Sequence, residues 1–241
     1  SQTQIRTWRN NGAGTFTAWG TSAIPSLGSG YPSEMAIGRF NNDAVPDVAI
    51  GVGHWPTSNL NGRVYVFTGN ATPGVFTNTV ASVSDMPQTY GVNSVAAIDS
   101  DGDGRDEVMA GIGMNNYQTN PALYGTSLTT TGMLSSGWSS RGSTMTNPYY
   151  GSTTGMDKLD FLGNGGRQLV QVHSGSPNYN HVQTVRVLSG SGLTNELTLP
   201  TPGNVGKCIT PIDGDFDPKI DFALTIGQNP GQIVVYRGST Q

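Results

Sequence analysis

The sequence has little charge, a single cysteine and no long apolar run, and each shortage argues against a class of protein. Charged residues make up 12% of the 241 residues and the formal net charge is −4, whereas disordered chains usually carry high net charge and few aromatics. No run of Lys and Arg occurs, which argues against nucleic-acid binding because phosphate neutralisation needs clustered basic side chains. The lone Cys208 cannot form an intrachain disulfide, and no stretch approaches the ~20 apolar residues of a membrane helix.

Glycine and short β-branched runs are abundant instead. The 34 glycines and 14 prolines separate short apolar segments along the whole sequence, a pattern typical of many strands and many turns. The composition is rich in Ser, Thr and Asn, and the chain begins at Ser1 rather than Met. We therefore expect a secreted, extracellular protein whose leader has been removed.

Four similar segments recur in the sequence, each with the same internal plan. A short apolar strand leads into an acidic or Asn/Gly turn, a second apolar strand follows, and a third and a weaker fourth come after a polar loop. The segments start at Tyr31, Tyr90, Tyr150 and Val205, which are 59, 60 and 55 residues apart. Four antiparallel strands per repeat of this length are typical of propeller blades. The sequence predicts one all-β domain, 1–241, with repeats at about 31–89, 90–149, 150–204 and 205–241 and closing strands in 1–30.

The second repeat carries the clearest motif. Tyr90-Gly91 is followed by Ser94-Val95-Ala96, and the stretch from Asp99 to Gly113 contains an Asp-rich turn and a strand ending in A-G-x-G. This motif resembles the FG-GAP (integrin-α-like, VCBS-type) repeat and its bacterial and fungal relatives, and the other three segments look like degraded copies. Residues 9–19, RNNGAGTFTAW, also resemble outer strands of fungal propeller lectins. The resemblance implies a β-propeller, here of four repeats plus an extra N-terminal strand pair, in which calcium has a structural role.

The acidic turn of the second repeat has the spacing of a calcium loop. Positions 1, 3, 5 and 9 are carboxylates, position 7 offers a backbone carbonyl, and Gly104 at position 6 permits a sharp turn. The candidate ligands are Asp99, Asp101, Asp103, Arg105 through its carbonyl, and Glu107. Carboxylates so close together repel one another without a cation, so the sequence predicts Ca²⁺. The alternative is a solvated acidic turn.

The turn of the fourth repeat fills the same positions, although Pro218 replaces the glycine and the loop must bend differently. Its candidate ligands are Asp213, Asp215, Asp217, Lys219 through its carbonyl, and Asp221. In the first turn Arg39 replaces the leading Asp, and a salt bridge from its guanidinium could substitute for the ion. In the third turn Leu162 and Gln168 replace carboxylates. We expect these two turns to be free of metal.

The loops after each second strand are candidate ligand-binding loops on the opposite face of a propeller. Three of the four place an aromatic among amides, and rings flanked by Asn suit the C–H faces and hydroxyls of sugars. The candidate residues are Trp55, Asn59, Asn116, Tyr117, Asn178, Tyr179 and Asn229. The alternative is that these aromatics only cover the bases of their loops.

No catalytic motif is found, because the three histidines lack HExxH spacing and no GxSxG or P-loop occurs. We therefore expect a binding protein rather than an enzyme: a lectin or adhesion module that binds glycans or an extracellular polysaccharide. The alternative is a structural, self-assembling extracellular protein with strand exchange between subunits. A polysaccharide-acting enzyme using Asp157 and Asp160 is a minor alternative.

The N-terminal strands predict how a ring would close. Strands at 4–10 and 15–21 precede three complete repeats and a last repeat of three strands, which makes seventeen strands, one more than four blades of four. The 15–21 strand can supply the missing outer strand of the last repeat. The 4–10 strand is then surplus, with unpaired backbone groups. We expect either a four-bladed disc with one extra edge strand, or N-terminal strands donated to a neighbouring subunit, which would give a homo-oligomer. A fragment of a larger propeller would have the same ragged ends.

Overall fold

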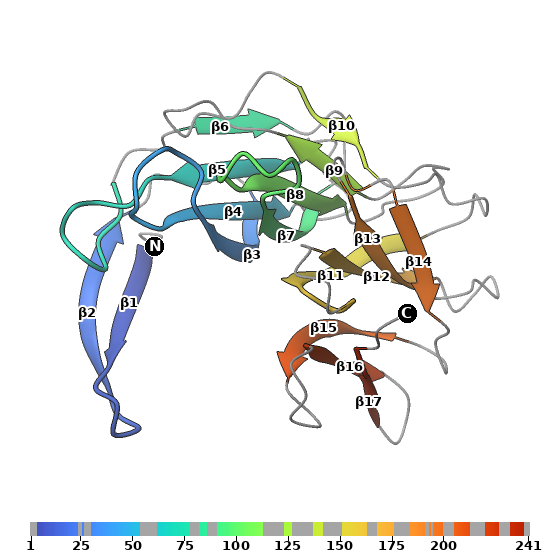
Figure 1. Cartoon of the computed structure of the whole chain (residues 1–241). Helices are drawn as coiled ribbons and strands as arrows, with labels where there is room; N and C mark the ends of the chain where they lie inside the picture. Colours follow the sequence, from blue (N-terminus) through green and yellow to red (C-terminus); the bar gives the residue numbers. More distant parts are fainter. Residues whose placement is uncertain are drawn as a thin grey trace.

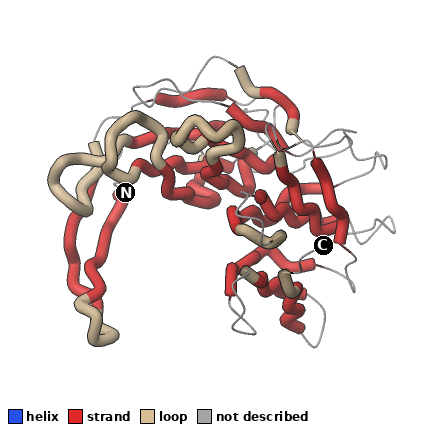
Figure 2. The backbone as a smooth tube through the Cα atoms, viewed as in Figure 1, coloured by secondary structure: helices blue, strands red, loops and turns tan. Residues whose placement is uncertain are grey.

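The computed structural model of the chain is all-β, as expected from the sequence. It describes residues 4–23, 26, 30–53, 62–77, 82–85, 91–112, 123–126, 137–141, 151–162, 168–175, 184–190, 193, 195–199, 205–212, 220–226 and 232–238. These residues contain strands, turns and bridges but no helix (Figure 2), and so none that is long and apolar enough to cross a membrane.

Seventeen strands are present in the described residues, the number expected, and they form five antiparallel sheets. An N-terminal hairpin pairs β1 (Gln4–Asn10) with β2 (Phe16–Ala23). The first sheet has β3 (Tyr31–Gly38), β4 (Asp47–Gly53), β5 (Arg63–Phe67) and β6 (Ser82–Asp85). The second has β7 (Val92–Ile98), β8 (Glu107–Ile112), β9 (Leu123–Thr126) and β10 (Ser139–Ser140). The third has β11 (Gly151–Leu159), β12 (Gln168–Gly175), β13 (Thr184–Ser189) and β14 (Asn195–Leu199). The fourth has β15 (Val205–Ile212), β16 (Asp221–Ile226) and β17 (Gln232–Tyr236).

The apolar runs of the inner strands exist because both faces of these sheets are buried. Side chains alternate between the faces of a strand, so Val48 and Ile50 of β4 pack toward the hairpin while Ala49 packs toward the second sheet. In β7, Val95 faces the first sheet and Ala96 faces the third. A strand buried on both faces reads as a continuous hydrophobic run rather than as an alternation.

One hydrophobic cluster fills each gap between neighbouring sheets. The first and second sheets share a cluster around Phe40 and Val108, and the second and third share one around Met109 and Leu169. The third and fourth sheets share a cluster in which Phe222 contacts Phe161, with ring centroids 5.2 Å apart. The sheets therefore stack in series, each against the next in the chain.

The first strands of the four sheets lie next to one another in the order β3, β7, β11, β15, and the sheets follow an open arc around them (Figure 1). Each of these strands has a bulge or irregularity in its pairing with the second strand of its sheet. Bulges increase local twist and bend the strand, which suits strands that turn around a common centre. A closed ring is not shown.

The N-terminal hairpin lies at one end of the arc, and the fourth sheet lies at the other (Figure 1). The sequence analysis expected the 15–21 strand to complete the fourth sheet, but within the described residues β2 pairs with β1 alone. The hairpin is instead held on the first sheet. Ile5 joins its core cluster, Thr7 Oγ1 donates to the carbonyl of Gly74 at 2.7 Å, and the Phe76 amide donates to Ser22 Oγ at 2.7 Å.

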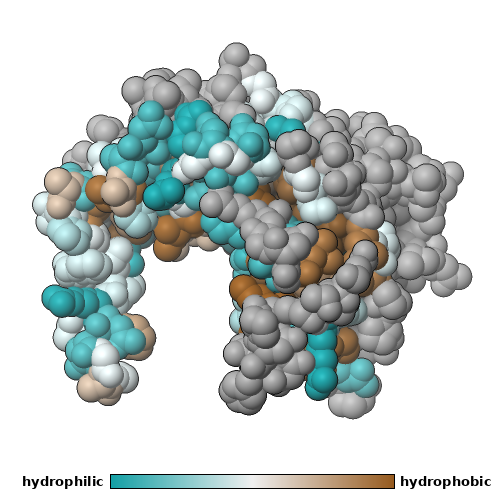
Figure 3. All heavy atoms as spheres, in the orientation of Figure 1, coloured by the Kyte–Doolittle hydropathy of each residue, from teal (hydrophilic) through white to brown (hydrophobic). Residues whose placement is uncertain are grey.

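Both ends of the series of sheets expose apolar side chains. Ile233 and Val235 of β17 are 72% and 46% exposed, and Trp8 and Phe16 of the hairpin are 54% and 65% exposed. Apolar residues also gather along the concave side of the arc (Figure 3). Within the described residues the fourth sheet ends at β17, and the outer edge of this strand has no partner strand.

Candidate metal centre

The candidate metal centre is the turn between β7 and β8, residues 99 to 107. Its shape depends on two glycines with left-handed backbone, Gly102 with a φ of 81° and Gly104 with a φ of 92°. A Cβ at either position would meet no atom within 4 Å, so the glycines are needed for backbone conformation rather than for space. The expectation that Gly104 makes the sharp turn is confirmed.

Three carboxylates converge inside this turn. One oxygen from each of Asp99, Asp101 and Glu107 lies within 4.8 Å of the other two. Ca²⁺ binds oxygen at 2.3–2.6 Å, so two ligands of one ion are separated by at most about 5 Å. The three side chains therefore form a group that could hold a metal ion, and their hard oxygen donors fit Ca²⁺.

Each carboxylate is also fixed by the turn itself. Asp99 accepts hydrogen bonds from the amides of Gly102 and Gly104 at 2.7 and 3.1 Å. Asp101 is exposed and accepts the amide of Asp103 at 3.1 Å. These hydrogen bonds hold the loop around the three converging carboxylate oxygens, so the backbone of the turn itself positions the site.

Glu107 is the most deeply buried of the three residues, with an exposed fraction of 4%. One of its oxygens accepts both the amide and the hydroxyl of Ser100, at 2.7 and 2.6 Å. Burial raises the pKa of Glu107 above its ordinary value, the bonds from Ser100 lower it, and the charges of Asp101 and Asp99 raise it. The repulsion among the carboxylates is the one expected when acidic groups are gathered without a cation.

One carboxylate expected from the sequence to be a ligand is placed differently. Asp103 lies outside the convergent group, because its carboxylate accepts hydrogen bonds from Arg105 Nη2 at 2.6 Å and Nε at 3.1 Å. The Arg105 amide also donates to Asp103 Oδ1 at 2.8 Å, and this backbone bond, followed by the bonds from the Arg105 side chain, lowers the pKa of Asp103. The side chain of Arg105, which the sequence analysis considered only for its carbonyl, thus neutralises the carboxylate at position 5.

Position 9 of the turn has a structural role in all four sheets that the sequence analysis did not anticipate. Asp47 accepts the amides of Phe40 and Gly69, both at 2.8 Å, and Gln168 accepts the amide of Leu162 at 3.1 Å. Asp221, expected to be a metal ligand, is 1% exposed and accepts the amide of Gly238 at 2.8 Å. Gly69 and Gly238 each lie two residues after the third strand of their sheet. Asp221 therefore makes the same hydrogen bond as Asp47, which belongs to the first turn, a turn expected to be free of metal.

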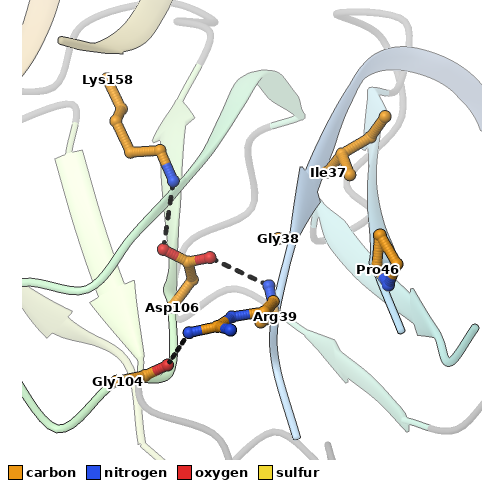
Figure 4. A pocket seen from close by; sticks show the side chains of 7 residues that line it. All are labelled: Ile37, Gly38, Arg39, Pro46, Gly104, Asp106 and Lys158. Carbon is orange, nitrogen blue, oxygen red and sulfur yellow. Dashed lines mark hydrogen bonds and ion pairs between the residues drawn. The ribbon is translucent and has the colours of Figure 1, made fainter. Parts of the chain in front are cut away.

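A network of polar contacts ties the acidic turn to the sheets on both sides (Figure 4). Arg39 and Asp106 exchange backbone contacts: the Asp106 amide donates to the Arg39 carbonyl at 2.8 Å, and the Arg39 amide donates to Asp106 Oδ2 at 2.9 Å. Lys158 Nζ lies 3.2 Å from Asp106 Oδ1. The Arg39 guanidinium donates to the Gly104 carbonyl at 3.1 Å. It therefore contacts the acidic turn of the second sheet instead of forming a salt bridge within the turn of the first sheet.

The remaining predicted site residues lie outside the described residues. They are Asp213, Asp215, Asp217 and Lys219 of the fourth turn, and Trp55, Asn59, Asn116, Tyr117, Asn178, Tyr179 and Asn229 of the candidate ligand loops. Their roles stay predictions.

No protein-family model matches the sequence, and no curated protein matches it. Among solved structures the chain is similar to the crystal structure of the V. cholerae biofilm matrix protein Bap1, with a TM-score of 0.45 and 12% sequence identity. The aligned region covers 91% of this chain and 40% of that chain, so this chain spans less than half of its length. Similarity at this level assigns neither a family nor a ligand.

Proposed function

We propose that this chain is a calcium-stabilised binding module of FG-GAP-like repeats arranged as propeller blades, which acts outside the cell and binds carbohydrate. The observation that carries the calcium part is the convergence of Asp99, Asp101 and Glu107 within 4.8 Å. The metal is structural: the same turn is bonded to Arg39 of the first sheet and, through Asp106, to Lys158 of the third. An ion in the turn would therefore stabilise the contacts of three sheets at once.

The carbohydrate part is supported by the sequence of the candidate ligand loops. Tyr117 and Tyr179 each lie between two amide residues, and Trp55 precedes Asn59 in the same loop; such loops combine a stacking surface with hydrogen-bonding amides. Loops positioned by a rigid scaffold commonly carry binding residues. Binding, rather than catalysis, is the activity we propose for this face.

Thermal unfolding with Ca²⁺ or with EGTA tests the metal, and a glycan array tests the ligand. Ca²⁺ should raise the melting temperature as its concentration increases, because it binds only the folded state, and Mg²⁺ should raise it less because it demands stricter octahedral geometry. Identical melting curves in Ca²⁺ and EGTA would contradict the calcium proposal. An array on which no glycan is retained would contradict the carbohydrate proposal.

A second candidate function, self-assembly outside the cell, is favoured by the apolar surfaces at the two ends of the series of sheets. Ile233 and Val235 are exposed at one end, and Trp8 and Phe16 at the other. Contact between unlike ends of two copies is heterologous and can propagate into filaments. Deleting residues 1–11 is the simplest test of such contacts. However, it also removes Ile5, which is buried on the first sheet, and would therefore disturb the monomer as well as any contact between copies.

Replacing Trp8 and Phe16 together with Ser leaves Ile5 in place and is therefore the cleaner test. If the protein self-associates through these ends, the double variant should sediment as a monomer where the wild type sediments as larger species. A wild-type protein that is monomeric at high concentration would contradict self-assembly.

A further inference from the structure

A hollow of about 340 Å³ lies beside the acidic turn, where the first three sheets meet (Figure 4). It is lined by Ile37, Gly38, Arg39, Pro46, Gly104, Asp106 and Lys158. This volume is at the lower end of the range of small-molecule pockets, roughly 300–1,000 Å³. It suits a ligand of the size of one sugar unit.

The charged side chains that line this hollow favour an anion. Arg39 and Lys158 contribute two positive charges and Asp106 one negative charge, in a protein whose net charge is −4. Asp106 is already bonded on both oxygens, to the Arg39 amide and to Lys158 Nζ. The Lys158 side chain is 40% exposed, so its remaining donors are accessible to a ligand.

Most N–H donors of the Arg39 guanidinium make no hydrogen bond within the described residues. A guanidinium carries five N–H donors in a planar fork that matches a carboxylate. In the described part of the chain, Arg39 uses its guanidinium for one bond, from Nη2 to the Gly104 carbonyl, and pairs with no carboxylate. Its backbone, not its side chain, makes the two contacts with Asp106. The fork is therefore held in place at the hollow while most of its N–H groups remain available.

The walls opposite these cations are apolar. Ile37 is 61% exposed at the hollow, and Pro46 lies beside it (Figure 4). A free inorganic anion would gain nothing from these two side chains. A ligand with a carboxylate on one side and C–H groups on the other would use both parts of the lining.

We infer that this hollow binds one unit of an acidic sugar, a hexuronate, with its carboxylate on Arg39 and Lys158. The ring lies against Ile37 and Pro46, and its hydroxyls donate to the Gly104 carbonyl and to Asp106. The choice of a sugar rests on the proposed carbohydrate-binding function, whereas the choice of a carboxylate rests on the charges of the hollow.

Titration calorimetry with D-glucuronate, D-glucose and acetate, in Ca²⁺ throughout, tests this assignment. Glucuronate should bind saturably and more weakly at high salt, because screening weakens exposed charge interactions. Glucose, which lacks the carboxylate, and acetate, which lacks the ring, should each bind at least tenfold more weakly. No glucuronate binding, or equal binding of glucose, overturns the proposal. Equal binding of acetate also overturns it, because the hollow would then be a plain anion site.

Arg39→Gln should weaken glucuronate binding at least tenfold, since hydrogen bonds between ions of opposite charge are about twice as strong as neutral ones. The matched control is Arg9→Gln, which removes an exposed arginine of the hairpin and should leave binding unchanged. Lys158→Gln provides the same test without touching the bond to Gly104. If Arg39→Gln and Lys158→Gln both bind glucuronate like the wild type, the hollow is not the site.

Trp55→Ala separates this proposal from the proposed ligand loops. Glucuronate binding that survives Trp55→Ala and is lost in Arg39→Gln places the acidic sugar in the hollow. The reverse result overturns the hollow and leaves the ligand loops as the carbohydrate site. An unchanged melting temperature of each variant in Ca²⁺ shows that the fold, and with it the metal site, is intact.

Discussion

Replacing Asp101 with Ala should remove most of the stabilisation that Ca²⁺ gives to the fold. Asp101 is the best residue for this test because it belongs to the convergent carboxylate group yet is exposed, and within the described residues its carboxylate accepts one hydrogen bond, from the Asp103 amide. Glu107 would be a poor choice, since its carboxylate also holds Ser100 and is buried. Loss of the Asp101 carboxylate therefore removes a metal ligand with little other damage.

The expected size follows from mass action. At a Ca²⁺ concentration of about 100 times Kd, binding stabilises the native state by about 2.7 kcal/mol, and about 1 kcal/mol shifts the melting temperature of a 150–250-residue domain by roughly 2–4 °C. The wild type should therefore melt about 5–11 °C higher in Ca²⁺ than in EGTA. In EGTA the variant loses one exposed hydrogen bond, about 0.5–1.5 kcal/mol, but also loses the repulsion between Asp101 and Glu107. Its curves in Ca²⁺ and EGTA should nearly coincide.

Asp103→Ala is the control that tests the geometry rather than the sequence pattern. The pattern alone assigns Asp103 as a ligand, whereas the structure places its carboxylate on Arg105, outside the group. Differential scanning calorimetry should find the Ca²⁺ response retained in Asp103→Ala and lost in Asp101→Ala. The opposite result would refute the reasoning from the convergent oxygens, and a wild type indifferent to EGTA would refute the calcium site itself.

Three further outcomes are expected. Burial raises the pKa of Glu34 to about 7; the hydrogen bond from the Val95 amide opposes this rise and the charge of Asp157 adds to it. Between about pH 4.5 and 7 the folded state therefore keeps a proton that the unfolded state releases, and stability falls as the pH rises. Glu34→Gln should abolish this fall in melting temperature. Asp106→Ala leaves a backbone amide of the first turn without its acceptor and should cost about 1–3 kcal/mol in urea unfolding, whereas Asp106→Asn, which keeps an acceptor oxygen, should cost less than half as much. Trp55→Ala should weaken retention of neutral glycans on an array without lowering the melting temperature, and unchanged retention would exclude this aromatic from the ligand site.

The strands and the acidic turn could be predicted from the sequence because both depend on local patterns. Runs such as Asp47–Gly53 are apolar at nearly every position because both faces are covered, and a run of this kind identifies a buried strand wherever it lies. The turn from Asp99 to Glu107 was recognisable because glycines with left-handed backbone and spaced carboxylates are properties of consecutive residues.

The contacts between sheets could not be predicted in this way. Nothing local to Arg39 indicates that its guanidinium bonds the carbonyl of Gly104, 65 residues away. Likewise, an aspartate at position 9 is compatible with a metal or with a backbone amide two residues beyond the third strand, and Asp47 shows the latter use. Such choices depend on which segments the tertiary structure brings together.

The same reason explains why the sequence could not predict where the N-terminal strands lie. Their sequence has the character of third and fourth strands but does not specify which sheet they join. Ile5 and Thr7 find their partners on the first sheet, in its apolar cluster and at the Gly74 carbonyl. Within the described residues the hairpin therefore packs on that sheet, and β17, which pairs with β16, has no partner strand on its outer edge.

The serial stacking of the sheets has a consequence for how the molecule loses its structure. When each unit contacts only its neighbours, the free energy approximates a sum of unit and interface contributions, as in a one-dimensional Ising chain. The interface between the third and fourth sheets, formed around Phe161 and Phe222, should then open more readily than the interface between the second and third sheets, because within the described residues the fourth sheet packs against one neighbouring sheet only. Fraying should begin there and travel inward, so that amide hydrogen exchange in β16 precedes exchange in β8, whose strand is enclosed by two interfaces.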